Sequence, residues 1–176
     1  MIEKRTKLLR IEHQSKFTML KNAVKEANAI QNFVKRTVIR KQWACKILIA
    51  VSENDLRVSK PVLVRNGKRG RPIKKYISKY TNRTLRKTKS HLHIILYGYP
   101  AQTIANEIVN NINKRHRKRC DNKKVVVSRS WKCNRGYIPY VINQITSVRQ
   151  VNYDPTGILC DLDFDEEYKK RKPEMF

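Results

Sequence analysis

Two closely spaced histidines are the first residues in this sequence whose types and spacing could support chemistry. In the segment KSHLHIILY, residues 89–97, one residue separates His91 from His93. Alternate residues of a β-strand project to the same face, so a strand here would place both imidazoles side by side. Imidazole nitrogens bind Mn, Zn and other divalent ions, which makes the pair a candidate metal site. The alternative is a pair of ordinary half-buried or surface histidines.

A tyrosine-containing segment further along the chain, GYIPYVINQ at residues 136–144, supplies a candidate nucleophile. In a helix, Tyr140 shares a face with Asn143 and Gln144, whereas Tyr137 lies toward the apolar positions. Tyr140 is therefore the expected exposed phenol, with Tyr137 as the alternate. A phenol with an ordinary pKa of ~10 needs a nearby cation, or an electrophile activated by a metal, to act as a nucleophile. A metal held by His91 and His93 would meet that need.

Together these motifs resemble those of the HUH endonucleases, above all the rolling-circle replication initiators (Rep proteins) of plasmids and small phages. HLHIIL at 91–96 is similar to the family's histidine motif, CKILIAV at 45–51 to its first strand motif, and GYIPYVINQ to its tyrosine motif. The resemblance implies that His91 and His93 hold Mg²⁺ or Mn²⁺ on a scissile phosphate. It also implies that Tyr140 attacks this phosphate, leaving a 5′ phosphotyrosine and a free 3′ hydroxyl.

The same resemblance implies an enzyme that nicks and rejoins single-stranded or hairpin DNA at a replication origin, with a host replication helicase as a further partner. A transposase or a conjugative relaxase would use the same chemistry. Family sites often include a third polar or acidic ligand, and Glu53 and Asp55 are the acidic candidates closest upstream of His91, unless they are turn residues. Many initiators have a lysine three residues after the tyrosine, where this chain has Asn143.

The charge of the chain independently indicates a polyanionic partner. Its 176 residues include 40 Lys or Arg and 14 Asp or Glu, a formal net charge of +26. No acidic residue lies between Asp55 and Glu107. We expect a chain this basic to bind nucleic acid through counterion release. A metabolic enzyme for small neutral substrates is disfavoured, whereas a non-catalytic DNA- or RNA-binding protein remains the alternative to a nuclease. The expected DNA contacts are Lys68, Arg69, Arg71, Lys74, Lys75, Arg83, Arg86, Lys87, Lys89 and Arg115.

One basic segment, KRGRP at 68–72, resembles the core of an AT-hook. Narrow A·T minor grooves concentrate negative potential and attract inserted arginine, which gives the resemblance a physical basis. The alternative is a basic hairpin tip that contacts phosphates without sequence preference.

The hydrophobic pattern predicts the elements that must position these residues. Helices are expected over 15–39, 101–119 and 139–148, and strands over 43–51, 89–97 and 123–129, with a further strand pair at 62–64 and 75–80. This order predicts an α+β fold, a single domain with a central, mostly antiparallel sheet flanked by helices, as in an RRM-like palm. We expect a basic helical segment at 1–40, the nuclease-like domain at 41–153 and an acidic tail at 154–176.

The remaining features concern the tail, the cysteines and the compartment. The tail carries alternating aspartates, Asp161, Asp163 and Asp165, which favour a strand edge or an acidic strip docked on the basic face over a metal site. The four cysteines contain no CxxC pair, so free thiols are expected. The longest uninterrupted aliphatic run is Ile47 to Val51, far below the ~18–20 residues that span a bilayer, so we expect a cytoplasmic protein without membrane contact.

Overall fold

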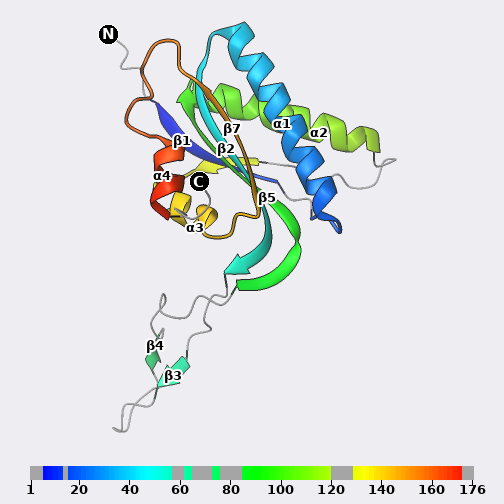
Figure 1. Cartoon of the computed structure of the whole chain (residues 1–176), viewed down its shortest axis with the longest axis vertical. Helices are drawn as coiled ribbons and strands as arrows, with labels where there is room; N and C mark the ends of the chain where they lie inside the picture. Colours follow the sequence, from blue (N-terminus) through cyan, green and yellow to red (C-terminus); the bar gives the residue numbers. More distant parts are fainter. Residues whose placement is uncertain are drawn as a thin grey trace.

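The computed structural model describes residues 6–13, 16–56, 62–64, 73–75, 85–119 and 129–171. Five of its strands form one antiparallel sheet in the order β6-β1-β5-β2-β7 (Figure 1). These strands are β1 Lys7–Glu12, β2 Ala44–Leu56, β5 Leu85–Tyr99, β6 Arg129–Lys132 and β7 Ser147–Tyr153. The helices are α1 Leu20–Lys41, α2 Ala101–Arg119, α3 Tyr137–Ile142 and α4 Phe164–Arg171. The expected α+β fold with a central antiparallel sheet is confirmed.

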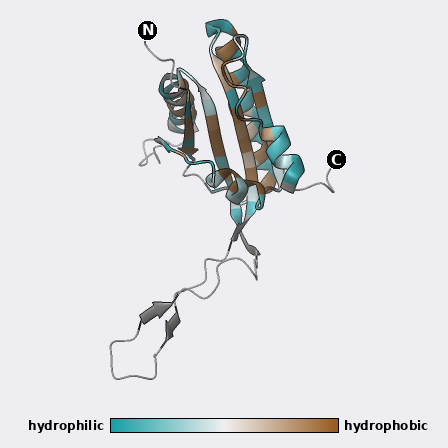
Figure 2. Ribbon diagram, turned by 90° about the vertical axis from the view of Figure 1, so that its left-hand side faces the viewer, coloured by the Kyte–Doolittle hydropathy of each residue, from teal (hydrophilic) through white to brown (hydrophobic). Residues whose placement is uncertain are grey.

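The helices cover both faces of the sheet because the central strands are apolar on both sides. Ile47, Ile49 and Ile94 point toward α1 and α2 and are fully buried there. On the opposite face, Leu48 and Ile95 pack beneath α3 and α4. Figure 2 shows these apolar strands as brown ribbons between the helices. Near-continuous apolar runs are typical of strands that are covered on both faces.

The first helix starts later than its apolar periodicity suggests. The backbone of Phe17 exchanges hydrogen bonds of 2.7 and 3.1 Å with Ser90 of β5, so this residue extends the sheet instead of beginning α1. Met19 precedes the first turn in an extended conformation, and the expected N-cap Ser15 lies outside the described residues. The helix continues to Lys41, two residues past its expected end, and Gln42 follows in the left-handed region at φ 54°.

The helix expected over 139–148 is wrong at its C-terminal end. α3 stops at Ile142, and Ser147 begins β7. Every residue of β7 pairs with a residue of β2. Without β7, the long β2 strand would present a row of unpaired backbone groups at the sheet edge, which proteins avoid. The backbone N–H of Thr146 already donates to the carbonyl of Val51 at 2.8 Å, so the turn into the sheet begins there.

The other strands agree only partly with expectation. β1 was not expected at all, because residues 1–40 were predicted to be helical. A separate two-stranded sheet pairs β3 Val62–Val64 with β4 Ile73–Lys75, so the second strand begins earlier than the expected 75–80. Most of the strand expected over 123–129 lies outside the described residues, and β6 begins at Arg129.

The acidic tail folds as a helix that belongs to the core, and the expectation of a strand edge is wrong. Leu159, Leu162, Phe164 and Tyr168 are buried in the same apolar cluster as residues of α3. Helices α3 and α4 lie next to each other (Figure 1). Asp163 caps α4, because its carboxylate accepts the backbone N–H of Asp165 at 2.8 Å. Acidic residues in the first turn also suit the positive end of a helix dipole. The carboxylates therefore have a local structural role.

Candidate active site

β5 brings the two histidines together on the sheet face that α3 covers. His91 and His93 alternate with Leu92, which is buried on the opposite face. Their cross-strand neighbours on β2 are Ser52 and Ala50, respectively. Both neighbours are small, so the imidazoles have space above the sheet. The expected strand and the expected shared face are both present.

The two rings present their Nε2 atoms to one another at 3.1 Å. The Nδ1–H of His91 donates to the backbone carbonyl of Lys89 at 3.0 Å. A carbonyl only accepts, so a neutral His91 has its lone pair on Nε2. The Nδ1 of His93 lies 3.1 Å from the hydroxyl of Tyr137, and a donor there would direct the second lone pair toward the same point.

This separation fits two ligands of one metal ion as well as a hydrogen bond between the two rings. Ligand nitrogens ~2.0–2.1 Å from a shared ion, at ordinary coordination angles, lie roughly 2.9–3.4 Å from each other. The observed 3.1 Å separation between the two Nε2 atoms falls within that range. Two lone pairs that face each other at this distance repel unless a cation or a proton lies between them. The pair is therefore a candidate metal site, with a shared proton as the alternative that also fits the distance.

Both candidate tyrosines lie beside the histidines, one turn apart on α3. The helix is held by Ile138, Val141 and Ile142, which are buried against the sheet. The rings of Tyr137 and Tyr140 stack at 5.5 Å, and their centroids lie 6.3 and 6.2 Å from that of His93. The structure therefore places the expected histidine and tyrosine motifs in one location.

The two phenols differ in their surroundings. Tyr140 is 36% exposed, as its position on the helix predicted. Tyr137 is half-buried, and burial raises the pKa of its hydroxyl, while the guanidinium of Arg10 acts in the opposite direction. That guanidinium lies over the Tyr137 ring, 5.4 Å from its centroid. The hydroxyl of Tyr137 thus contacts the Nδ1 of His93, whereas the side chain of Tyr140 remains accessible to solvent.

A cavity of about 340 Å³ opens next to the histidine pair. β1 forms one wall of this cavity. Its register with β5 places Arg10 and Glu12 on the same sheet face as His93. Lys16 also lines the cavity and adds a second cation. Two cations beside a candidate metal site suit a phosphate group. The full lining is Arg10, Ile11, Glu12, His13, Lys16, His91, Leu92, His93 and Tyr137.

Glu12 is the acidic residue that the sequence analysis missed. It pairs directly with His93 across the β1–β5 ladder, so its carboxylate shares the face of the imidazoles. The indole N–H of Trp131 donates to this carboxylate at 3.2 Å. The signal was present in the alternation of LLRIE, where Leu9 and Ile11 face the core. Because residues 1–40 were predicted to be helical, this alternation was not interpreted as a strand.

The expected third ligands occupy less direct positions. Glu53 lies at an irregularity of β2 between Ser52 and Asn54, and its backbone N–H donates to Thr146 Oγ1 at 3.3 Å. The side chain of Asp55 lies outside the described residues. Gln144 is also buried close to β2, because its backbone carbonyl accepts the hydroxyl of Ser52, the neighbour of His91, at 2.7 Å. Among the described side chains, its Oε1 has no hydrogen-bond partner.

Most of the expected DNA-contacting residues cannot be placed. Lys89 is exposed two residues before His91. Arg115 instead makes an ion pair of 2.6 Å with the buried carboxylate of Glu26, so its charge is directed inward. Lys68, Arg69, Arg71 and Arg83 lie outside the described residues, as do the side chains of Lys74, Lys75, Arg86 and Lys87.

A second group of potential metal ligands lies elsewhere in the molecule. His13, Glu26 and His116 offer ligand atoms that all lie within 4.8 Å of one another. Within the described part of the chain, this is the only such group of three or more His, Cys, Asp or Glu residues.

No helix in that part of the chain has both the length and the apolar character needed to cross a membrane. In comparisons with known proteins, no family model, curated protein or solved structure matches this chain.

Proposed function

We propose that this protein is a metal-dependent DNA nicking and strand-transfer enzyme that acts through a 5′ phosphotyrosine intermediate. The observation that carries the proposal is the convergence of the His91 and His93 Nε2 atoms at 3.1 Å beside two stacked tyrosines. The adjoining cavity with Arg10 and Lys16 gives the scissile phosphate a cationic place to bind. The high positive charge of the chain supports single-stranded or hairpin origin DNA as the substrate.

In this mechanism Tyr140 is the nucleophile and Tyr137 is a positioning residue. The phenolic oxygen of Tyr140 forms a bond to the scissile phosphorus, and the bond from phosphorus to the 3′ oxygen breaks. The phenol loses its proton, and the departing 3′ oxygen takes one up to become a hydroxyl. Tyr137 holds the ring of His93 through Nδ1, on the side of the imidazole away from Nε2. Reversal by a new 3′ hydroxyl would restore the tyrosine and join the strands.

His91 and His93 would hold the metal, with Glu12 or Gln144 as the third protein ligand. A bound divalent ion supplies Lewis-acid polarisation of the phosphate oxygens. Of the two ions that the sequence suggests, Mn²⁺ suits this donor set better, because Mg²⁺ strongly prefers an all-oxygen shell. We therefore propose higher activity with Mn²⁺ than with Mg²⁺.

The test is covalent capture of DNA. The full chain is incubated with a pool of labelled single-stranded oligonucleotides and Mn²⁺, denatured, and examined for a band of protein-linked DNA. The account expects an adduct in the wild type and in Tyr153→Phe, a control whose hydroxyl bonds Gln42 away from the histidines. It expects none in Tyr140→Phe. An adduct that survives Tyr140→Phe but disappears in Tyr137→Phe would reassign the nucleophile.

A non-catalytic single-strand-binding protein is the second candidate, and one observation favours it. Trp131 on β6 is 45% exposed and lies opposite Arg10 in the sheet. Exposed aromatic rings beside cations stack unpaired bases without requiring catalysis. Binding that persists in a chelator, with no adduct on any substrate, would favour this function over the first.

A further inference from the structure

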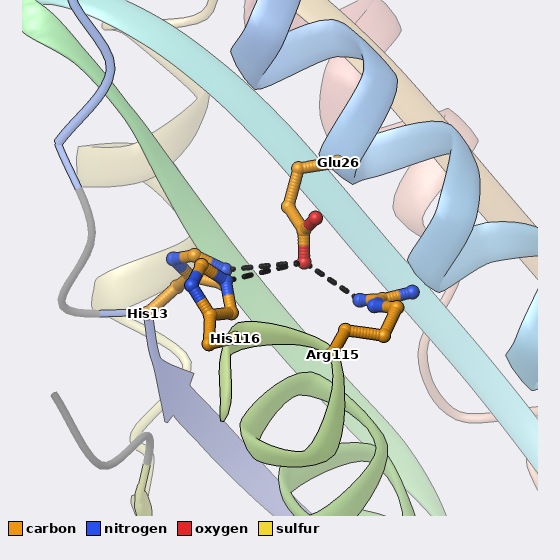
Figure 3. A network of polar contacts seen from close by, with 4 residues as sticks. All are labelled: His13, Glu26, Arg115 and His116. Atoms are coloured by element: carbon orange, nitrogen blue, oxygen red, sulfur yellow. Dashed lines mark hydrogen bonds and ion pairs between the residues drawn. The ribbon is translucent and has the colours of Figure 1, made fainter. Parts of the chain in front are cut away.

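Two imidazoles and one carboxylate meet in the interior on the face of the sheet that α1 and α2 cover. His13 follows β1, Glu26 lies on α1 and His116 lies on α2, so three separate elements contribute (Figure 3). The side chains of His13 and Glu26 are 0% and 1% exposed, and that of His116 is 15% exposed. Burying a carboxylate is costly unless cations or strong donors surround it.

The separations in this cluster are long for hydrogen bonds. The Nε2 atoms of His13 and His116 lie 3.4 and 3.7 Å from the same Oε1 atom of Glu26. A typical N–H···O bond spans only ~2.7–3.2 Å. By contrast, two ligands in a tetrahedral zinc shell lie about 3.3–3.4 Å apart, given bonds of ~2.0–2.1 Å. The observed distances are therefore closer to the edges of a coordination shell than to direct hydrogen bonds.

Arg115 does not block this arrangement. Its guanidinium donates to the same Oε1 at 2.6 Å, but it approaches from the side opposite the two imidazoles (Figure 3). A carboxylate oxygen has two lone pairs, so one can bind a metal while the other accepts the arginine. Metal-ligating carboxylates are commonly held by such an outer hydrogen bond. Burial alone would raise the pKa of Glu26, but His116, His13 and Arg115 together lower it.

We infer that His13, Glu26 and His116 form a second metal site, separate from the His91 and His93 pair, that takes Zn²⁺ or a cation of similar preference. Two imidazoles and one carboxylate are a donor set that zinc favours. A metal there would tie the end of β1 to both α1 and α2. His13 also lines the cavity next to the histidine pair, so the second metal would fix one wall of that cavity.

The experiment measures zinc retention when the first site has been removed. An untagged His91→Ala/His93→Ala double variant is loaded with Zn²⁺, desalted and assayed for bound zinc per chain by plasma mass spectrometry. The inference expects one equivalent in this variant, and an affinity at least ~10-fold lower after His116→Ala is added. Adding Lys114→Ala, a change at an exposed position on the same helix, should leave the zinc content unchanged.

Two outcomes would overturn the inference. One is a double variant that retains no zinc, which would make the cluster a buried ion pair only. The other is zinc that is retained equally after His116→Ala. Thermal unfolding provides a second measurement on the double variant itself, since a ligand that binds only the folded state raises Tm with concentration. No rise in Tm with added Zn²⁺ would also count against the site. None of these readouts depends on DNA cleavage.

Discussion

At the level of single residues, the proposed chemistry depends on which atoms of the histidines face which partners. The carbonyl of Lys89 fixes the Nδ1–H of His91, so the neutral ring can offer only Nε2 to a metal. His93 has the hydroxyl of Tyr137 in the corresponding place. Partners of this kind orient metal-ligating imidazoles, and their loss weakens metal binding. The two tyrosines therefore have separable roles.

Replacing Tyr137 tests its positioning role. Tyr137→Phe removes the hydroxyl that contacts His93, so Mn²⁺ affinity should fall by about 10–100-fold. Tyr140→Phe should leave that affinity unchanged while removing the nucleophile. Mn²⁺ binding is measured by electron paramagnetic resonance of the free ion in the His116→Ala background, which removes the second site. Equal affinities in the two variants would show that Tyr137 does not support the ligand.

The cysteines test the burial of the interior strand β2. Burial raises the pKa of the Cys45 thiol to about 12, whereas Cys160 is exposed. Thiolate is the reactive form, so at pH 8 iodoacetamide should label Cys160 in the folded protein and Cys45 only after unfolding. Peptide mass spectrometry distinguishes the two sites. Labelling of Cys45 as fast as that of Cys160 would contradict the burial of β2 between β5 and β7.

At the element scale, the parts predicted well were those with strong periodicity. α2 matches its predicted range, Ala101–Arg119, and the histidine strand lies within β5. β1 and β7 were missed because each is short and rich in charged or polar residues, so only pairing with β5 or β2 reveals them. The missed β1 strand carries Glu12, so the same error removed a site residue from the prediction.

The candidate site was predictable to a similar extent. The sequence placed His91, His93 and Tyr140 together through their motifs, and the structure brings them to one location. It could not indicate Glu12 or the cavity, because both depend on β1 lying next to β5. The cluster around Glu26 was equally hidden, since its members come from three separate elements.

The capping of α4 gives an element-scale prediction. Asp163→Ala removes the acceptor for the backbone N–H of Asp165 and should lower the free energy of unfolding by about 1 kcal/mol. Asp163→Asn is the matched control, because asparagine caps helices about as well as aspartate. Urea denaturation followed by circular dichroism measures both. If the two variants were destabilised equally, the charge rather than the cap would explain the role of Asp163.

At the scale of the whole molecule, charge and fold have different consequences. The net charge of +26 favours binding to a polyanion, whereas the sheet positions the residues of the proposed reaction. Binding to single-stranded DNA should therefore weaken steeply with salt, with a slope of log K against log [salt] of about −0.7 for each phosphate neutralised. Fluorescence anisotropy across a salt series measures that slope. A slope near zero would mean that the positive charge does not carry the binding.

The tail is part of the folded core, because Leu159 and Tyr168 lie in the apolar cluster beneath α3. The tail and the tyrosine helix thus stabilise each other. Leu159→Ala should cost roughly 2–5 kcal/mol of unfolding free energy, as for other buried leucines. Thr156→Ala, at an exposed position in the preceding turn, is the control and should change little. A cost below ~1 kcal/mol for Leu159→Ala would indicate that the tail is not part of the core.

The central claim is that Tyr140 becomes covalently linked to DNA. The most direct measurement is mass spectrometry of the digested protein after reaction with single-stranded origin-like DNA and Mn²⁺, followed by nuclease trimming. The account predicts a nucleotide attached through its 5′ phosphate to Tyr140, and no such peptide when His91 and His93 are both alanine. A modified residue other than Tyr140, or an adduct that forms without the two histidines, would contradict it.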